Sequence, residues 1–290
     1  MTMKIGAMLD CFRTGAEESM KKAAEAGIGG VQITVSVGDL TAEAVRDYPY
    51  RETSALLTEY GLSLTALCGL SGYEYNDPEE NGTCVEKTCL ALELAYGLGC
   101  GIVTSHIGVV PERECPEKEA MRAALNRISA CGDRVGAVFA VETGPERGVV
   151  LGGLLDSLDG NGVRVNFDPA NLVMCADDRP EEALRHLGRY VVHTHAKDGL
   201  MAEKHLTDPR YPAEIRDGWR EGLRRGRTWQ EMPLGEGDVD FDVYLPALAA
   251  AGFDGWLTIE REAGATPAKD VILAADFLRE KLKKHGIPLT

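Results

Sequence analysis

The sequence predicts an α/β protein built as a single (β/α)8 TIM barrel, and three observations support this. Short apolar runs of strand type alternate with segments of helical period, at a spacing of about 25 to 35 residues. Eight such units suit a closed barrel better than an open doubly wound sheet. The length of 290 residues also suits one large barrel, because such barrels take about 250 residues. No linker or low-complexity segment marks a second domain, so we expect one domain over residues 1–290.

The elements can be placed in order along the chain. Strands are expected at 4–9, 30–35, 63–68, 102–107, 137–142, 163–168, 191–197 and 255–260. Helices are expected at 15–26, 41–60, 83–98, 117–133, 148–158, 180–188, 240–251 and 267–284. Thr41 is a plausible N-cap, and Gly27, Gly61 and Gly252 stand where helix C-caps are expected. The glycine patterns that bind nucleotide phosphates are absent, so nucleotide binding lacks its usual signature.

A long polar stretch at about 199–237 separates the seventh strand from its helix. It contains Trp219, Trp229, the basic run 224–227 and the segment PLGEGDVDF. A loop of this length inside a compact domain is usually functional or disordered. The aromatic residues and the Gly-Glu-Gly sequence favour a folded lid or an oligomer contact.

Composition limits the partners and the location. The formal net charge of −15 repels phosphates, so we expect no nucleic-acid binding. No apolar run approaches the roughly 20 residues that span a membrane. Asp10 stands where a signal peptide would have its apolar segment, so we expect a cytoplasmic protein without a membrane partner.

The eight cysteines are scattered and form no C-x-x-C pair. Disulfide frameworks belong to small secreted domains, so these thiols are expected to be reduced and mostly buried as small apolar residues. Cys68 ends a predicted strand and is the one that we expect near the active site.

Four of the expected strands end on residues that can bind a divalent metal. They are AVFAVE ending at Glu142, VRVNFD at Asp168, VVHTH at His195 and GWLTIE at Glu260. The carboxyl ends of barrel strands converge on one rim, where active sites are built. We therefore expect three carboxylates and one imidazole to meet there. Because side chains alternate along a strand, His193 shares the face of His195.

A hard, mostly oxygen ligand set with one imidazole suits Mn²⁺, Mg²⁺ or Co²⁺ better than a sulfur-rich zinc site. Mn²⁺ is our first choice, and Zn²⁺ stays an alternative. A single Glu at a strand end is commonly a helix N-cap neighbour or a solvated loop residue. Burial of three carboxylates without a cation would be costly, however, so we favour one bound divalent ion.

With these motifs the sequence resembles the sugar phosphate isomerase/epimerase family. These are the xylose isomerase-like barrels, which include ketose 3-epimerases, inosose dehydratases and endonuclease IV. The matching stretches are VETGPE, NFDPANL, HTHAKD, PLGEGDVDF and GWLTIERE, and they extend essentially end to end. The resemblance implies that Glu142, Asp168, His195 and Glu260 bind one divalent metal, with His195 preferred over His193. It also implies that the two glutamates act as an acid/base pair on opposite faces of the substrate.

The resemblance further suggests substrate contacts. His106, at the end of SHIG, matches a substrate-facing histidine, although a hydrogen-bonded core histidine fits nearly as well. Glu146 and Lys197 are candidate hydroxyl or phosphate contacts, although Lys197 could simply pair with a neighbouring acid. Glu236 could reach the pocket from the lid, or its segment could be only a turn. Asn171 stands where many epimerases have a histidine beside the metal.

Two departures weaken the match to a simple ketose 3-epimerase. One is Asn171, and the other is Met201, where free-ketose epimerases often have an arginine. Endonuclease IV activity is disfavoured further, because its multi-metal histidine set is missing and the protein is acidic.

The chemistry that fits is proton abstraction next to a carbonyl, with a metal that stabilises the negative oxygen of an enediolate. The leading expectation is a metal-dependent isomerase or epimerase of a sugar, a sugar phosphate or a related polyol ketone. The alternative is a lyase, either an inosose dehydratase or an enzyme that eliminates a group from a 3-keto sugar derivative. A carbohydrate-binding barrel without chemistry is disfavoured because all four ligands are present. The resemblance also suggests a homo-oligomer.

Overall fold

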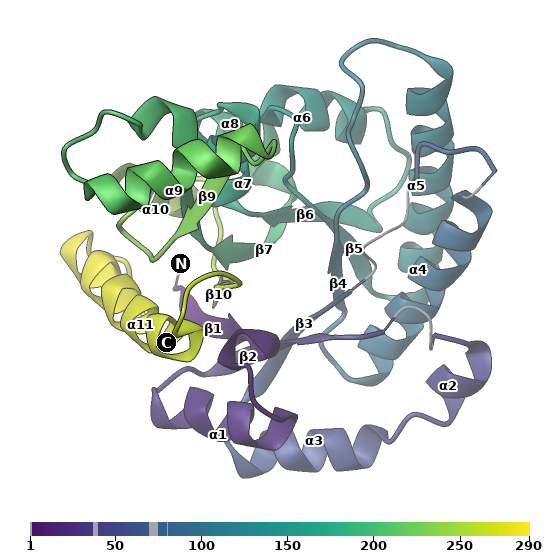
Figure 1. The fold of residues 1–290 in the computed structure, drawn as a ribbon. Helices are drawn as coiled ribbons and strands as arrows, with labels where there is room; N and C mark the ends of the chain where they lie inside the picture. Colours follow the sequence, from purple (N-terminus) through teal and green to yellow (C-terminus); the bar gives the residue numbers. More distant parts are fainter. Residues whose placement is uncertain (1, 37–39, 70–74, 80) are drawn as a thin grey trace.

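The computed structural model describes residues 2–36, 40–69, 75–79 and 81–290, and within them eight parallel strands close a barrel (Figure 1). Their order around the barrel is β1-β10-β7-β6-β5-β4-β3-β2. The strands are β1 (Lys4–Met8), β2 (Gly30–Thr34), β3 (Ser63–Cys68), β4 (Ile102–Ser105), β5 (Val138–Glu142), β6 (Val163–Phe167), β7 (Val191–Ala196) and β10 (Trp256–Ile259). The predicted (β/α)8 barrel is thus confirmed, and each expected strand lies within a residue or two of its predicted place.

Helices surround the barrel on its outside, apart from α9, which belongs to an insertion (Figure 1). They are α1 (Ala16–Glu25), α2 (Ala42–Arg46), α3 (Tyr50–Glu59), α4 (Asn81–Gly97), α5 (Pro116–Val135), α6 (Gly148–Asp156), α7 (Pro169–Asn171), α8 (Pro180–Leu187), α9 (Ala213–Arg224), α10 (Phe241–Ala250) and α11 (Pro267–Lys284). Among the described residues no helix is both long enough and apolar enough to cross a bilayer.

The prediction of one helix over 41–60 was wrong. Thr41 does cap a helix, because its side chain accepts a hydrogen bond from the Ala44 N–H, but that helix already ends at Arg46. A second helix begins after Pro49. Proline lacks an N–H and disfavours the α conformation of the residue before it, so the segment bends between α2 and α3.

Strand alternation separates the outer core from the polar barrel interior. Phe167 on β6 points outward and stacks on Tyr244 of α10, with ring centroids 5.7 Å apart. Its neighbours Asn166 and Asp168 must therefore point inward, because successive side chains of a strand face opposite sides. Inside the barrel, Asn166 Oδ1 lies 2.9 Å from His193 Nδ1. The apolar core thus lies between strands and helices, and polar side chains occupy the axis.

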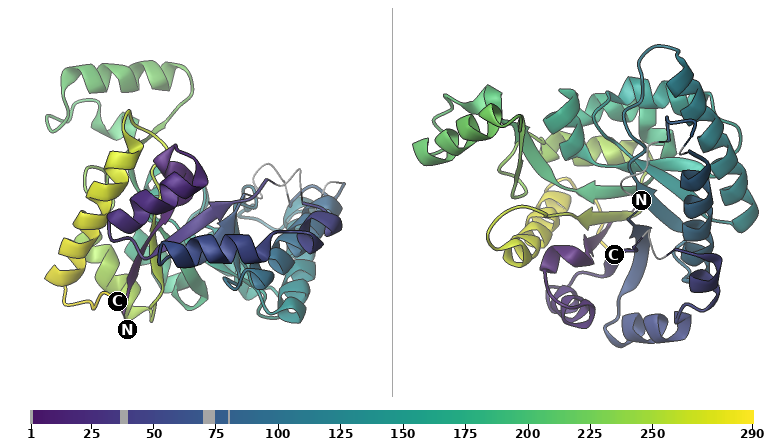
Figure 2. Two further views of the ribbon diagram at one scale, coloured as in Figure 1. Left: turned by 90° about the horizontal axis from the view of Figure 1, so that it is seen from below. Right: turned by 45° about the vertical axis from the view of Figure 1, so that its right-hand side comes forward.

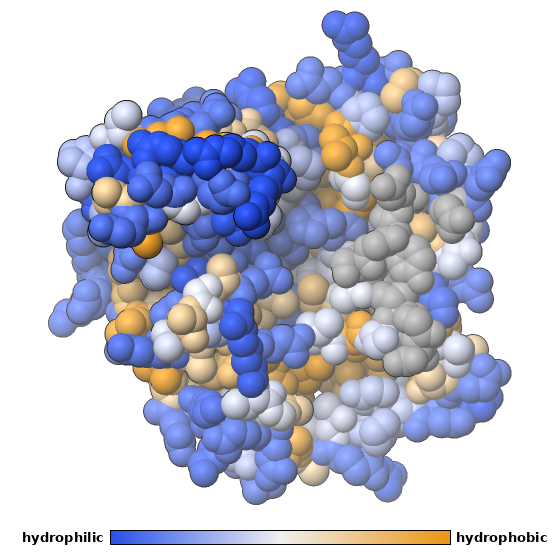
Figure 3. Space-filling view, in the orientation of Figure 1, coloured by the Kyte–Doolittle hydropathy of each residue, from blue (hydrophilic) through white to orange (hydrophobic). Residues whose placement is uncertain are grey.

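The predicted insertion at 199–237 is folded. Strand β8 (Asp198–Met201) pairs in antiparallel fashion with β9 (Trp229–Met232), and α9 lies between them. A separate apolar cluster fills this unit: Leu200, Ala202, Tyr211 and Trp219. The unit projects beyond the barrel in both views of Figure 2, and its outer α9 face is strongly hydrophilic (Figure 3). Its role as a lid or an oligomer contact stays a prediction, as does the single domain over 1–290.

Both ends of the insertion close on one buried carboxylate, that of Asp198. Its oxygens accept hydrogen bonds from the backbone N–H groups of Gly199, Gly235, Gly237 and Val239 at 2.8 to 3.1 Å. A Cβ on Gly237 would lie 2.2 Å from Asp198 Oδ1, so only glycine fits there. The Lys-Asp pair after β7 and the Gly-Glu-Gly segment are therefore two halves of one structural joint.

Candidate metal centre

Four buried side chains converge at the carboxyl ends of β5, β6, β7 and β10. They are Glu142, Asp168, His195 and Glu260, and one possible ligand atom from each lies within 4.8 Å of all the others. His195 Nδ1 is the shared neighbour, at 3.4 Å from Glu142 Oε1, 3.8 Å from Asp168 Oδ2 and 2.9 Å from Glu260 Oε2. In the part of the chain that the structure describes, no other group of this kind is found.

The ring of His195 is oriented by a chain of hydrogen bonds across the barrel. The Gln32 amide nitrogen donates to Thr104 Oγ1 at 3.0 Å, which turns Gln32 Oε1 toward His195. That oxygen lies 3.2 Å from His195 Nε2 and accepts its N–H. In the neutral form of the ring, this tautomer keeps a lone pair on Nδ1 that faces the three carboxylates. A second residue that fixes the tautomer is usual for metal-binding histidines.

Glu142 is held by neutral amides on both oxygens. Asn171 Nδ2 donates to Oε1 at 3.1 Å, and Asn166 Nδ2 donates to Oε2 at 3.2 Å. His106 Nε2 approaches Oε1 at 3.5 Å from a half-exposed position. Burial raises the pKa of Glu142, but the imidazoles of His195 and His106, in their protonated forms, lower it more, so the pKa lies below its usual range.

Asp168 is fixed by the helix that it caps. Its Oδ1 accepts hydrogen bonds from the backbone N–H groups of Ala170 and Asn171 at 2.7 and 3.1 Å, so the carboxylate begins α7 as an N-cap. This leaves Oδ2 turned toward the cluster. Burial raises the pKa of Asp168 above its usual range.

Glu260 is paired with a buried ammonium. Lys197 Nζ lies 3.1 Å from Glu260 Oε1, 3.4 Å from Glu262 Oε2 and 3.9 Å from Asp168 Oδ2. Burial raises the pKa of Glu260, but Lys197 and His195 lower it more, so it stays ionised. Burial lowers the pKa of Lys197, but the facing carboxylates raise it well above its usual range.

Two carboxylate oxygens indicate that the cluster could hold a cation. Asp168 Oδ2 and Glu260 Oε2 are buried without a hydrogen-bond donor. Glu260 Oε2 faces the lone pair on His195 Nδ1 at 2.9 Å, and two acceptors this close need a positive charge between them. A divalent ion would supply it; a proton on Nδ1 is the competing occupant, because both use the same lone pair. Three carboxylates and one imidazole fit a hard divalent metal.

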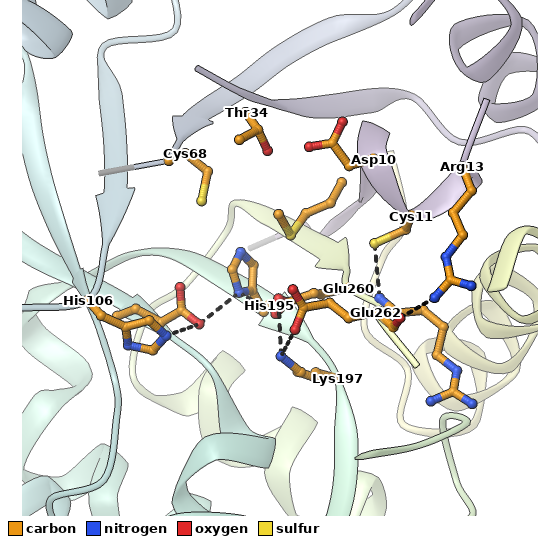
Figure 4. Close-up of a pocket in the computed structure, with 14 residues that line it drawn as sticks. Asp10, Cys11, Arg13, Thr34, Cys68, His106, His195, Lys197, Glu260 and Glu262 are labelled. Atoms are coloured by element: carbon orange, nitrogen blue, oxygen red, sulfur yellow. Dashed lines mark hydrogen bonds and ion pairs between the residues drawn. The ribbon is translucent and has the colours of Figure 1, made fainter. Parts of the chain in front are cut away.

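The cluster opens into a pocket of about 410 Å³. Of the predicted substrate contacts, His106, Lys197 and Cys68 line it, and Figure 4 shows Cys68 across the pocket from His195. Burial, followed by the charge of Glu142, raises the pKa of the Cys68 thiol to about 11, so it stays protonated. The catalytic and substrate-binding roles of these residues stay predictions.

The remaining predicted contacts lie behind the pocket or outside it. Asn171 contacts Glu142 rather than the pocket space. Glu146 is buried next to the loop of His106, and its Oε2 has no hydrogen-bond partner. Glu236 is exposed and lines a different hollow, between α9 and β9. His193 lies deeper in the barrel, where it contacts Asn166 and Thr258, and it is outside the ligand group.

Several pocket residues were not predicted from the sequence. Asp10, Cys11 and Arg13 follow β1, and Glu262 follows β10. Their common signal is position: each comes directly after the carboxyl end of a barrel strand, where such sites are built. The sequence contained that signal, and the matching stretch GWLTIERE includes Glu262, but Asp10, Cys11 and Arg13 lie in none of the matching stretches.

The sequence profile of the xylose isomerase-like TIM barrel family matches residues 20–281. The chain belongs to this family. Inosose dehydratase of Clostridium perfringens strain 13 is 31% identical over 133 residues, which cover 44% of this chain. The match spans only 41% of the length of that curated relative.

Solved structures match over nearly the whole chain. A xylose isomerase domain protein from Planctomyces limnophilus has a TM-score of 0.73 at 25% identity, with 98% of each chain covered. A D-tagatose 3-epimerase-like protein has a TM-score of 0.71 at 18% identity, again with 98% of each chain covered, and this likeness shows the fold alone. A partial relative of the chain is thus named as a dehydratase, and the fold is shared with a protein named as epimerase-like.

Proposed function

We propose that this protein is a metal-dependent isomerase or epimerase that acts on a sugar, a sugar phosphate or a related polyol ketone. The observation that carries the proposal is the meeting of Glu142 and Glu260 around His195 Nδ1, at the base of a pocket that opens at the barrel mouth. Two carboxylates beside one candidate cation site are suited to move a proton at a carbon next to a carbonyl.

Glu142, Asp168, His195 and Glu260 would hold one divalent metal, with Mn²⁺ as our first choice. When bound, such a metal supplies Lewis-acid stabilisation for the negative oxygen of an enediolate. The remaining steps belong to side chains. One glutamate removes the α-proton, and the other returns a proton to the carbon.

Neighbouring side chains orient both glutamates for proton transfer. The Asn171 and Asn166 amides fix the direction of the Glu142 carboxylate, and Lys197 fixes that of Glu260. The pKa of each carboxylate lies below its usual range, which suits the one that acts as base. The partner takes up a proton from water before it returns one to the carbon. Across the pocket from His195 lie Cys11, Thr34 and Cys68, together with the carboxylate of Asp10 (Figure 4).

A lyase is the second candidate, and one observation favours it. The curated relative named above is an inosose dehydratase, at 31% identity over 133 residues. Elimination needs the same first step, because a β-substituent can leave from the intermediate before the carbon is reprotonated. The two reactions therefore use the same glutamates and differ in the fate of the neighbouring carbon.

Incubation of the Mn²⁺-loaded protein with a panel of ketoses, ketose phosphates and inososes in D₂O tests both candidates. Deuterium gained at an inverted carbon supports the isomerase or epimerase, whereas loss of water or of an aglycone supports the lyase. Elemental analysis of the purified protein gives an independent check. A protein without bound divalent metal, and without exchange at any carbon after metal is added, would contradict both.

A further inference from the structure

Arg13 lies at the mouth of the pocket that contains the metal cluster. Strand β1 ends at Met8, a short 3-10 helix covers Leu9–Phe12, and Arg13 follows as its C-cap. Its side chain lines the pocket of the metal cluster. In Figure 4, Arg13 and His106 lie at opposite ends of the pocket, with His195 between them.

The backbone of Arg13 is in the left-handed region, with φ of 51° and ψ of 37°. Among the described residues other than glycine, only Arg13 and Asp177 have a positive φ. A long side chain rarely adopts this conformation, and where it does, the surrounding structure must enforce it. The conformation of Arg13 is therefore imposed, and such sites cluster where a protein binds ligands.

The guanidinium is held in place without using all of its donors. It donates to the backbone carbonyls of Gly264 and Glu262, in the loop after β10. That loop is in turn anchored by Glu231 of the insertion, whose carboxylate accepts from Arg261 Nη1 at 2.6 Å and from the N–H groups of Glu262 and Ala263 at 3.1 Å. The two carbonyls leave several N–H groups of the guanidinium for a ligand.

Arg13 also differs from the other cationic side chains of the pocket in its charge partners. Lys197 is surrounded by Glu260, Glu262 and Asp168. Arg261 pairs with Glu231 at 2.6 Å and with Asp270 at 2.8 Å. Arg13 has no ion pair with any carboxylate of the described residues. The segments outside the described ranges contain no lysine or arginine that could replace it.

We propose that Arg13 binds an anionic substituent, a carboxylate or a phosphate, at the end of the substrate that is remote from Glu142. The inference rests on the proposed function, because it presumes a polyol ketone at the cluster. The planar guanidinium fork matches the paired oxygens of either group. Asp10 and Glu262 also line the pocket and would repel an anion, so Arg13 is the residue that admits one.

The test is a comparison of equilibrium affinities by isothermal titration calorimetry on the Mn²⁺-loaded protein. The probes are D-fructose, its 6-phosphate and 5-keto-D-gluconate, which are a neutral, a phosphorylated and a carboxylated molecule of similar size. We expect at least one anionic probe to bind about tenfold or more tightly than fructose. The anionic probe with the larger ratio identifies the substituent.

Substitutions of Arg13 test whether its guanidinium, rather than its left-handed backbone, is responsible for anion binding. Arg13→Asn keeps a residue that tolerates the left-handed conformation, and it should bring the affinity ratio close to one. Arg13→Lys should give an intermediate ratio, because the charge remains and the fork is lost. Arg225→Asn, at an exposed arginine of the insertion, should retain the wild-type ratio.

A wild-type ratio near one for both anionic probes overturns the proposal. So does a ratio that survives Arg13→Asn, since the anion would then bind elsewhere, for example at the metal. Deuterium exchange is measured separately. If no deuterium is exchanged but the affinity ratio is intact and depends on Arg13, the proposed reaction is wrong and the anion subsite stands. If deuterium is exchanged but the affinity ratio does not depend on Arg13, only the anion subsite is wrong.

Discussion

The two glutamates of the cluster are the same residue type in opposite surroundings. Glu142 receives hydrogen bonds from two neutral amides, those of Asn171 and Asn166. Glu260 faces the Lys197 ammonium on one oxygen, and its other oxygen has no donor. The Glu142 carboxylate is thus oriented by two uncharged donors, beside the imidazoles of His195 and His106, whereas Glu260 has the Lys197 ammonium and His195 to balance its buried charge. The side of the cluster near Glu260 should therefore respond more strongly to loss of a charge or of a metal.

The largest expected effect is on turnover, because the proposed reaction requires both glutamates. Glu142→Gln and Glu260→Gln each keep the side-chain shape and remove the proton acceptor. We expect kcat to fall by about 10²- to 10⁴-fold in each variant, the range attributed to general acid–base catalysis. The initial rate of deuterium exchange measures this. Near-normal exchange in either variant would show that its glutamate is not part of the acid/base pair.

Removal of the Lys197 ammonium should lower the free energy of unfolding more than removal of a neutral donor on the Glu142 side. Lys197→Met leaves Glu260 and Asp168 without their ammonium, and loss of one member of a buried ion pair costs about 3–5 kcal/mol. Added Mn²⁺ should restore much of this, because a cation that binds only the folded state stabilises it. Thermal unfolding with EDTA and with Mn²⁺ gives both values.

The matched control is Asn171→Ala, which removes a neutral donor from Glu142. It should cost about 1–3 kcal/mol, and Mn²⁺ should stabilise the variant by about as much as it does the wild type. Equal responses of the two variants to Mn²⁺ would mean that the two sides do not differ as the contacts indicate.

A smaller effect is expected from Glu146, a second buried carboxyl on the side of Glu142. Burial raises its pKa from 4.5 to about 7. A carboxyl with a raised folded-state pKa contributes stability that is complete below pH 4.5 and is lost as the pH rises through 7. Glu146→Gln cannot ionise, so above pH 7 it should exceed the wild type by up to about 3 kcal/mol, at about 1.4 kcal/mol per pKa unit. At pH 4 the two should unfold at similar temperatures, and a constant difference between pH 4 and pH 8 would argue against the raised pKa.

Much of the fold could be predicted because the information is local. Phe167 and Asp168 show why: strand alternation sends one outward to Tyr244 and the other inward to the cluster, whatever the rest of the chain does. The residues that end a helix are also local in sequence. Pro49 indicates a helix boundary, and the prediction of one helix over 41–60 did not take it into account.

Contacts across the structure could not be predicted in this way. Glu231 lies in a strand of the insertion with no distinctive pattern, yet its carboxylate organises the loop after β10. Arg13 is significant only because that loop offers it two carbonyls. Glu236 was singled out from its flanking glycines, but those glycines serve the Asp198 joint, and the side chain points elsewhere.

The Asp198 joint has a consequence for how this chain can be altered. Because one carboxylate gathers the backbone of Gly199 and of residues 235–239, the two ends of the insertion are tied together independently of what lies between them. We therefore expect the outer part, with α9 and its own small apolar cluster, to be exchangeable. Chimeras that carry a shorter or longer outer part should keep Lys197 in register, as long as Asp198, Gly237 and the loop anchor Glu231 are retained.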